Sequence, residues 1–463
     1  MTEATVSPVA GSASGPARIL PSLLLLSAPI VVSQFAQMAS GVVDVVMAGN
    51  LGVQTLGAVA TGAAVWTPMM IFLLGLLYGL TPAIGQRLGD SGSEGDVAGV
   101  AGLAARGLVV GLAGGTVLGS ALFWGSAPLF QLAGVAPDLI PDATAYLRWV
   151  AFALPGMGLF LAARFVLEAH RAPAVVTLIT VMGVAAKIAL NDAFVHGHMG
   201  LPALGSAGFG AATVAVFWGM GGALLAVSLL VRAVRPLWGH RLRTADLSPA
   251  EMGRFILFGL PIALNFLSDY LVMAVVAVFM ATIGAVAIGA HQIAFNILMI
   301  LLMTPTGLSM AATILISRAA GGGDRARLGV VMGWTLGLGV GLSVLLAALL
   351  AAFDGEVTGL YTQDAIVVGL TLDLLWVVVV VLTIDVLAIA LGFFLRGLGD
   401  PGSPFLVLLV AHWLVSLPLG YVLCFTDWIV APQGPLGWWY GLSAGLVVAC
   451  VLLALRLGQR LKG

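Results

Sequence analysis

The chain has 463 residues, of which 60% are hydrophobic and 8% charged, and its net charge at pH 7 is -1. A soluble domain carries about 25% charged residues, so this composition excludes a soluble globular protein and indicates a chain that spans a membrane many times. The near-zero net charge provides no electrostatic basis for binding nucleic acid, which we exclude as a partner. The lipid bilayer is the expected surroundings of most of the chain.

The predicted elements begin after a tail. Residues 1–20, rich in Ser, Ala, Gly and Pro, are expected to be disordered. The apolar stretch that follows is too long for a signal peptide and lacks a basic leader, so we expect it to remain as a membrane helix. A helix needs about 20 apolar residues to cross a bilayer. Twelve segments meet this length: 21–48, 54–86, 98–124, 143–166, 172–196, 207–232, 255–280, 286–317, 328–352, 367–395, 403–425 and 436–457.

The two halves of the chain resemble each other at a spacing of 232 residues. Pro29-Ile30 recurs as Pro261-Ile262, and Leu204-Gly205 recurs as Leu436-Gly437. A unit of this length is far longer than the repeats of solenoids and propellers. In a chain this apolar, a doubled bundle is typical of a transporter whose substrate site lies between the two halves.

We therefore predict an all-α polytopic membrane protein with twelve transmembrane helices in two pseudo-symmetric six-helix bundles. The N-terminal lobe is predicted to span 21–232, the cytoplasmic linker 233–254 and the C-terminal lobe 255–463. Because each half has an even number of helices, the repeat is expected to be parallel.

The basic residues predict the orientation. With the N-terminus in the cytoplasm, most of them fall in or beside cytoplasmic loops, Arg164 and Arg396 included, whereas Arg148 and Lys187 do not. This is the distribution that the positive-inside rule describes. Both termini are thus expected to be cytoplasmic, and the chain is expected to be a monomer.

Four ionisable residues lie inside predicted spans: Asp44, Lys187, Asp269 and Asp385. Each costs about 2.5–3.5 kcal/mol at mid-helix, so such residues usually mark ion paths or proton relays, although an ion pair that only fixes packing is the alternative. Two carboxylates that share a buried site titrate together and can bind and release one cation. We predict that Asp269 and Asp385 couple transport to Na⁺ or H⁺.

Polar neighbours could complete the ligands of a cation at this pair. The candidates are Asn265, Ser268, Thr383, His291, Gln292 and Asn296. In the N-terminal half, an ion pair between Lys187 and Asp44 is the simplest way to keep both charges buried. Asn191 lies one turn after Lys187, and Gln37 lies two turns before Asp44, so we group the four as an N-lobe polar site,.

Other motifs give weaker evidence for a function. His196 and His198 could bind a metal, but two histidines without further ligands are more often solvated, and we predict no metal site,. The sequence contains no pairing of a nucleophile with a base, which argues against an enzyme. We expect no cofactor beyond the coupling ion.

With these residues, the chain resembles a bacterial member of the multidrug and toxic compound extrusion (MATE) family, in its NorM-like branch. The resemblance runs from about Pro21 to Arg456, and its most specific stretches are Gly41 to Gly49, Gly289 to Gln292, and Asp385 followed by Arg396-Gly397. It implies two six-helix lobes around a V-shaped cleft, and export of organic, often cationic, drugs across a bacterial inner membrane in exchange for Na⁺ or H⁺.

The resemblance also implies roles for particular residues. The family's cation site in the C-lobe matches Asp269 and Asp385, its N-lobe aspartate and asparagine match Asp44 and Asn191, and its helix-bending proline matches Pro29. The chain departs from the family where it has Asp269 instead of glutamate, Val381 instead of tyrosine, and Lys187 instead of a neutral polar residue. A lipid-linked precursor flippase of the same superfold is the alternative, but three buried acids against one lysine favour cationic cargo.

Overall fold

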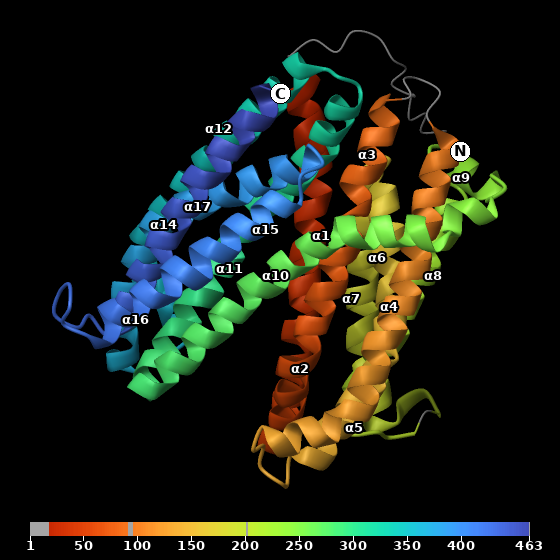
Figure 1. Ribbon diagram of the computed structural model, residues 1–463. Helices are drawn as coiled ribbons and strands as arrows, with labels where there is room; N and C mark the ends of the chain where they lie inside the picture. The colour runs from red at the N-terminus through yellow and green to blue at the C-terminus, as the bar shows by residue number, and fades with distance from the viewer. Residues whose placement is uncertain (1–17, 91–95, 201, 463) are drawn as a thin grey trace, which may run out of the picture.

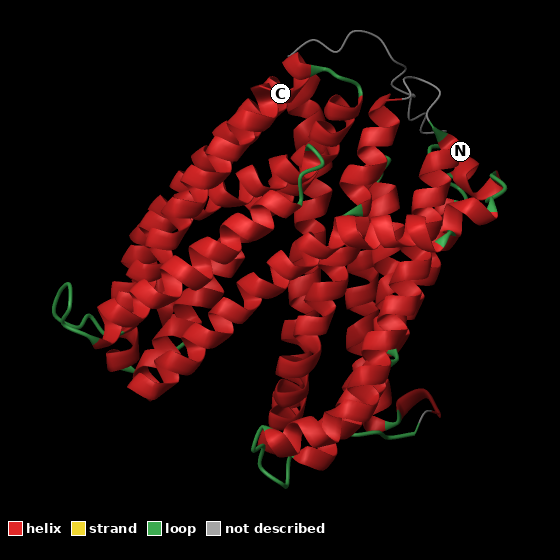
Figure 2. Cartoon of the chain, viewed as in Figure 1, coloured by secondary structure: helices red, strands yellow, loops and turns green. Residues whose placement is uncertain are grey.

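All the regular structure in the described part of the chain is helical (Figure 2). The computed structural model describes residues 18–90, 96–200 and 202–462. Within these ranges, twelve helical stretches are long and apolar enough to cross a membrane. Each coincides with one predicted segment; the largest difference is at the end of the third, which continues to Leu132 instead of 124.

The first bundle contains eight helices, because two of its six spans are each divided into two. They are α1 (Ile19–Leu51), α2 (Val53–Tyr78), α3 (Leu80–Asp90), α4 (Val97–Leu132), α5 (Ile140–Ala151), α6 (Ala153–Ala169), α7 (Pro173–His196) and α8 (Ser206–Ser228). The span Val53–Asp90 is made of α2 and α3, and the span Ile140–Ala169 of α5 and α6.

The second bundle follows a connection that holds α9 (Arg235–Gly239) and the short 3₁₀-helix η3 (Thr244–Leu247). Its helices are α10 (Pro249–Ile283), α11 (Ala285–Gly321), α12 (Arg325–Ala352), α13 (Asp354–Gly359), α14 (Ala365–Gly397), α15 (Gly402–Leu409), α16 (Leu417–Phe425) and α17 (Pro435–Lys462). A π-helical segment, η4 (Val410–Ser416), joins α15 to α16 in one span. The predicted linker 233–254 therefore includes the start of α10.

The repeat is visible at the junctions between helices. Gly52 separates α1 from α2, and Gly284 separates α10 from α11, at the same repeat position. Their φ angles are 119° and 144°, a region that side-chain-bearing residues rarely adopt,. Each bundle thus uses a glycine to turn the chain within one residue.

The two bundles meet at one end and lean apart toward the other, as Figure 1 shows. At the interface α10 packs against α2, and α1 and α3 pack against α11. Glycines permit close backbone approach at the end where the bundles meet. A Cβ added to Gly89 would lie 2.0 Å from the carbonyl oxygen of Arg318, and one added to Gly321 would lie 1.9 Å from that of Gln86. This end is closed by main-chain packing.

Gly89→Ala is expected to disturb this closure. The new methyl group must displace α11, and overpacking of this kind costs about 1–3 kcal/mol. Gly329→Ala on α12 is the matched control, because no atom lies within 4 Å of the added Cβ. Thermal unfolding of the purified protein in detergent measures both variants. Equal midpoints for the two would contradict a closed interface at Gly89.

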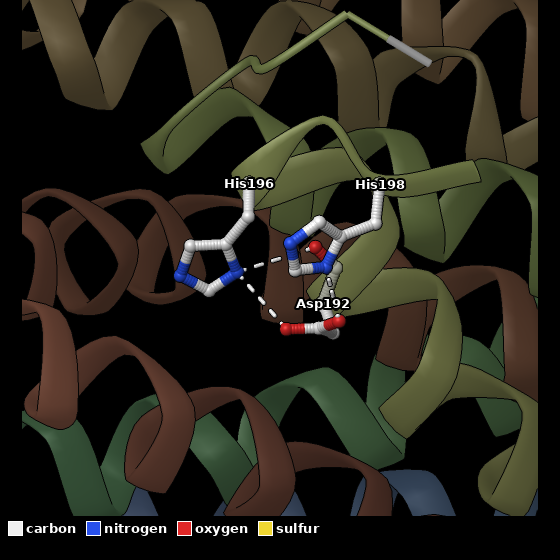
Figure 3. Close-up of side chains that lie close together, drawn as sticks. All are labelled: Asp192, His196 and His198. Carbon is white, nitrogen blue, oxygen red and sulfur yellow. Dashed lines mark hydrogen bonds and ion pairs between the residues drawn. The ribbon is translucent and has the colours of Figure 1, made fainter. Parts of the chain in front are cut away.

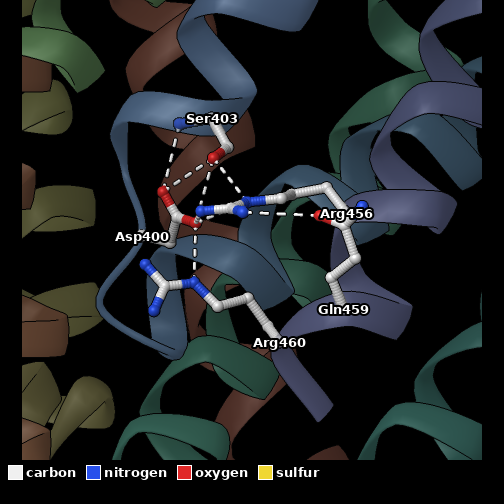
Figure 4. A network of polar contacts seen from close by, with 5 residues as sticks. All are labelled: Asp400, Ser403, Arg456, Gln459 and Arg460. Atoms are coloured by element: carbon white, nitrogen blue, oxygen red, sulfur yellow. Dashed lines mark hydrogen bonds and ion pairs between the residues drawn. The ribbon is translucent and has the colours of Figure 1, made fainter. Parts of the chain in front are cut away.

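A charged network fixes the second bundle at the same end (Figure 4). Asp400, between α14 and α15, accepts hydrogen bonds at Oδ2 from Arg456 Nη2 at 2.7 Å and Arg460 Nε at 2.8 Å, both on α17. Burial raises the pKa of Asp400, but hydrogen bonds from Arg460, Ser403 and Arg456 outweigh it and hold the pKa below its usual range,. The α14–α15 turn is thereby anchored to the last helix.

Candidate functional site

A cavity of about 470 Å³ lies between the two bundles. Most of its wall comes from α10, α11, α14 and α17, and the first bundle contributes residues such as Tyr78 and Arg164. The wall is mainly apolar. Its methionines and phenylalanines are Met273, Met299, Met303, Met310, Phe165, Phe266, Phe295 and Phe393.

Asp269 and Asp385 both line this cavity, one from α10 and one from α14. Asp269 Oδ2 accepts a hydrogen bond from Asn265 Nδ2 at 3.1 Å, one helical turn earlier. Its Oδ1 lies 3.3 Å from His412 Nδ1, and the Asp269 side chain remains 41% exposed. The two acids that the sequence placed at mid-span therefore face one common space.

His412 was not identified from the sequence. It lies on the π-helical segment η4, its side chain is 10% exposed, and it lines the same cavity. π-Helical turns within α-helices often occur at functional sites. The signal that could have revealed it is the cost of any ionisable group inside a span, which applies to an imidazole as well as to a carboxylate.

Two arginines that were predicted at the cytoplasmic ends of helices also line the cavity. Arg164 is buried and its Nε pairs with Glu168 Oε1 at 2.7 Å. Arg396 donates to Asn265 Oδ1, and its guanidinium lies 4.9 Å from the Phe266 ring centroid. The count of three buried acids against one lysine was therefore wrong, because it omitted these two cations. It also omitted three other buried charged residues: Glu168, Arg106 and Asp400.

Of the six candidate cation ligands, Asn265 forms a hydrogen bond with Asp269. Three others bind elsewhere: Ser268 accepts from Trp413 at 2.8 Å, Thr383 from Ser343 at 3.1 Å, and Asn296 from the Tyr361 hydroxyl at 2.7 Å. The His291 ring lies 5.7 Å from that of Trp439. Gln292 is exposed.

The N-lobe polar site contains the predicted ion pair. Lys187 Nζ on α7 lies 2.6 Å from Asp44 Oδ2 on α1, and both side chains are nearly buried. Asn191 Nδ2 donates to the other carboxylate oxygen at 2.9 Å, and Lys187 also donates to Ser40 Oγ at 3.1 Å. Gln37 instead donates to the Ser33 carbonyl. Among the described residues, the pair is not part of the cavity wall.

Pro29 lies inside α1, which continues through it as one helix. The Thr177 hydroxyl on α7 lies 2.6 Å from the Pro29 carbonyl oxygen and donates to it. Proline has no N–H, so the carbonyl of Leu25, one turn earlier, loses its helical donor. The Thr177 bond reaches the Pro29 carbonyl itself and links α7 to α1 at the proline.

Comparison with known proteins gives the same architecture. Residues 29–193 and 261–422, one stretch in each bundle, match the MatE family. Among solved structures, the eukaryotic MATE transporter AtDTX14 superposes with a TM-score of 0.83 at 18% identity, over 97% of this chain and 98% of that chain.

Two further solved structures have the same fold. A mutant of the Vibrio cholerae MATE transporter VcmN has a TM-score of 0.84 at 18% identity, over 96% of this chain and 98% of that chain. A MOP superfamily transporter from Pyrococcus furiosus, described as having a binding pocket of reversed polarity, has a TM-score of 0.83 at 19% identity, over 98% and 99%. The NorM-like branch stays a prediction. The family match covers both bundles and more than half of the chain. This protein therefore belongs to the MatE family and is a multi-pass membrane protein that works as a secondary transporter of the multidrug and toxin efflux kind.

Proposed function

We propose that the chain exports small organic, often cationic, compounds across the bacterial inner membrane in exchange for a cation, by alternating access between the two bundles. The observation that carries the proposal is that Asp269 and Asp385 line one cavity between the bundles. A wall of methionines and phenylalanines suits apolar cargo of varied shape. In this proposal the protein acts as a monomer with both termini in the cytoplasm.

The coupling ion in this proposal is H⁺. A hard cation such as Na⁺ prefers several oxygen ligands. Asn265 turns its NH₂ group to Asp269, and its oxygen accepts from Arg396. His412 Nδ1 lies 3.3 Å from Asp269 Oδ1 instead, so a proton taken up by the imidazole can supply the positive charge that Na⁺ would bring,. Asp385 faces the same cavity and provides a second carboxylate for the proton.

Efflux from proteoliposomes under separately imposed gradients tests the proposal. We expect an imposed pH gradient without Na⁺ to drive ethidium export, and an Na⁺ gradient at uniform pH to drive none. Transport driven by Na⁺ alone would overturn the assignment of H⁺. Transport of a lipid-linked sugar without transport of ethidium would show that the protein is a flippase and not a drug exporter.

His412→Gln provides a second arm of this test. The amide has a similar size and can donate to Asp269, but it cannot carry the proton. We expect ethidium binding to persist while the response of transport to the pH gradient falls. His240→Gln, in the connection between the bundles, is the matched histidine control.

A further inference from the structure

We propose that Asp192, His196 and His198 form a binding site for a divalent transition-metal ion such as Zn²⁺, at the C-terminal end of α7 (Figure 3). The two histidines were expected to be solvated because the sequence pattern showed no third ligand. The structure corrects that premise, because the Asp192 carboxylate contacts the Nδ1 atoms of both rings. The site is separate from the transport cavity.

Local backbone geometry assembles the three side chains. Asp192 and His196 are four residues apart on α7, so they lie on one face of the helix,. Gly197 then adopts a left-handed conformation, with φ 77°, and reverses the chain. The turn brings His198, at the start of the short 3₁₀-helix η2 (His198–Gly200), back over the same carboxylate. Seven consecutive residues thus supply two imidazoles and one carboxylate.

The interatomic distances are close to those of a metal site. His196 Nδ1 lies 3.0 Å from Asp192 Oδ1, and His198 Nδ1 lies 2.8 Å from Oδ2. One candidate ligand atom from each residue lies within 4.8 Å of the other two. Bond lengths of about 2.0–2.2 Å place the ligand atoms of tetrahedral Zn²⁺ roughly 3.3 Å apart. Small side-chain rotations therefore admit the ion, which replaces the protons shared with the carboxylate.

The chemistry of the ligands selects the class of ion. Two nitrogens and one carboxylate oxygen suit Zn²⁺, Ni²⁺ or Cu²⁺, whereas Mg²⁺ and Ca²⁺ prefer oxygen ligands. The side chains of Asp192, His196 and His198 are 49%, 43% and 60% exposed. Solvent therefore has access to a fourth coordination position. Because each ligand must be deprotonated, protons compete with the metal ion for the site.

The site has a structural consequence for α7. Asn191, which holds Asp44 of α1, directly precedes Asp192. A metal ion bound to both α7 and η2 would hold the C-terminal end of the helix to the chain that leads to α8. The ion would therefore reduce fraying of α7 next to the N-lobe polar site.

Calorimetric titration of the purified full-length protein with ZnCl₂, after removal of any affinity tag, tests the proposal. We expect one site in the unmodified protein, and binding weakened by more than about tenfold in both His198→Ala and Asp192→Ala, since even outer-sphere partners of a metal contribute 10–100-fold. His240→Ala, which changes a histidine outside the cluster, should leave the titration unchanged.

Co²⁺ provides an independent measurement, because its visible absorption reports tetrahedral nitrogen and oxygen ligands. The band is expected in the unmodified protein and in His240→Ala, and to disappear in His198→Ala. The cluster is exposed, so these variants are expected to fold, and thermal unfolding without metal checks this. Equal Zn²⁺ binding by the unmodified protein and His198→Ala, or no saturable binding by either, would overturn the proposal.

Discussion

Asp385→Asn is expected to reduce drug export to the level of protein-free liposomes while leaving the folded protein in the membrane. The substitution keeps the shape of the side chain but removes its ability to bind and release a proton or another cation. In an antiporter the drug and the cation must each shift the balance between the two facing states, so the loss of one partner stops net turnover. Ethidium efflux from proteoliposomes measures the effect.

Asp373→Asn on the same helix is the matched control, because Asp373 is exposed and outside the cavity wall. It should transport as the unmodified protein does. Binding of ethidium to Asp385→Asn, followed by fluorescence, separates lost coupling from lost cargo binding. Normal export by Asp385→Asn would exclude this carboxylate from the mechanism and would direct attention to Asp269 and His412 alone.

Most of the fold could be predicted because membrane spans depend on simple physical limits. Long apolar segments identify the spans, and the 232-residue repeat predicts that the two bundles are alike. Gly52 and Gly284 occupy the same position of the repeat because the chain has a positive φ at both junctions, and glycine adopts such an angle most readily,. The breaks that divide one span into α2 and α3, and another into α5 and α6, could not be predicted from hydropathy, because the sequence stays apolar across them.

The site could be predicted only in part, because proximity along a helix is not proximity in space. Asp269 and Asp385 were evident from the cost of a charge within a span. Ser268 and Thr383 are near them in sequence, but rotation of about 100° per residue turns them to other faces, where Trp413 and Ser343 bind them,.

Asn265 and Asp269 show the opposite case, because four residues of separation place both side chains on one face,. His412 approaches Asp269 from a different span, at a sequence distance that no local pattern encodes. Contacts of this kind need the packing of α10 against η4, which only the folded bundle provides.

Lys187→Met is expected to destabilise the N-terminal bundle strongly. It leaves the Asp44 carboxylate without its ammonium partner, and that carboxylate is only 11% exposed. Removing one partner of a buried ion pair costs about 3–5 kcal/mol, because the remaining charge is uncompensated. Asn191 still donates one hydrogen bond, but a neutral amide does not balance the charge. Thermal unfolding in detergent measures the loss, and Lys462→Met, at the exposed end of α17, is the control that the chain's other lysine provides.

The double variant Asp44→Asn, Lys187→Met separates structure from transport. With both charges removed, stability should return close to that of the unmodified protein, because replacing a whole buried pair is often neutral. The amide introduced at position 44 can still accept from Asn191. If the double variant exports ethidium normally, the pair only holds α1 against α7. If it is stable but inactive, Asp44 acts in transport together with the acids of the cavity. A double variant as unstable as Lys187→Met would contradict the ion pair itself.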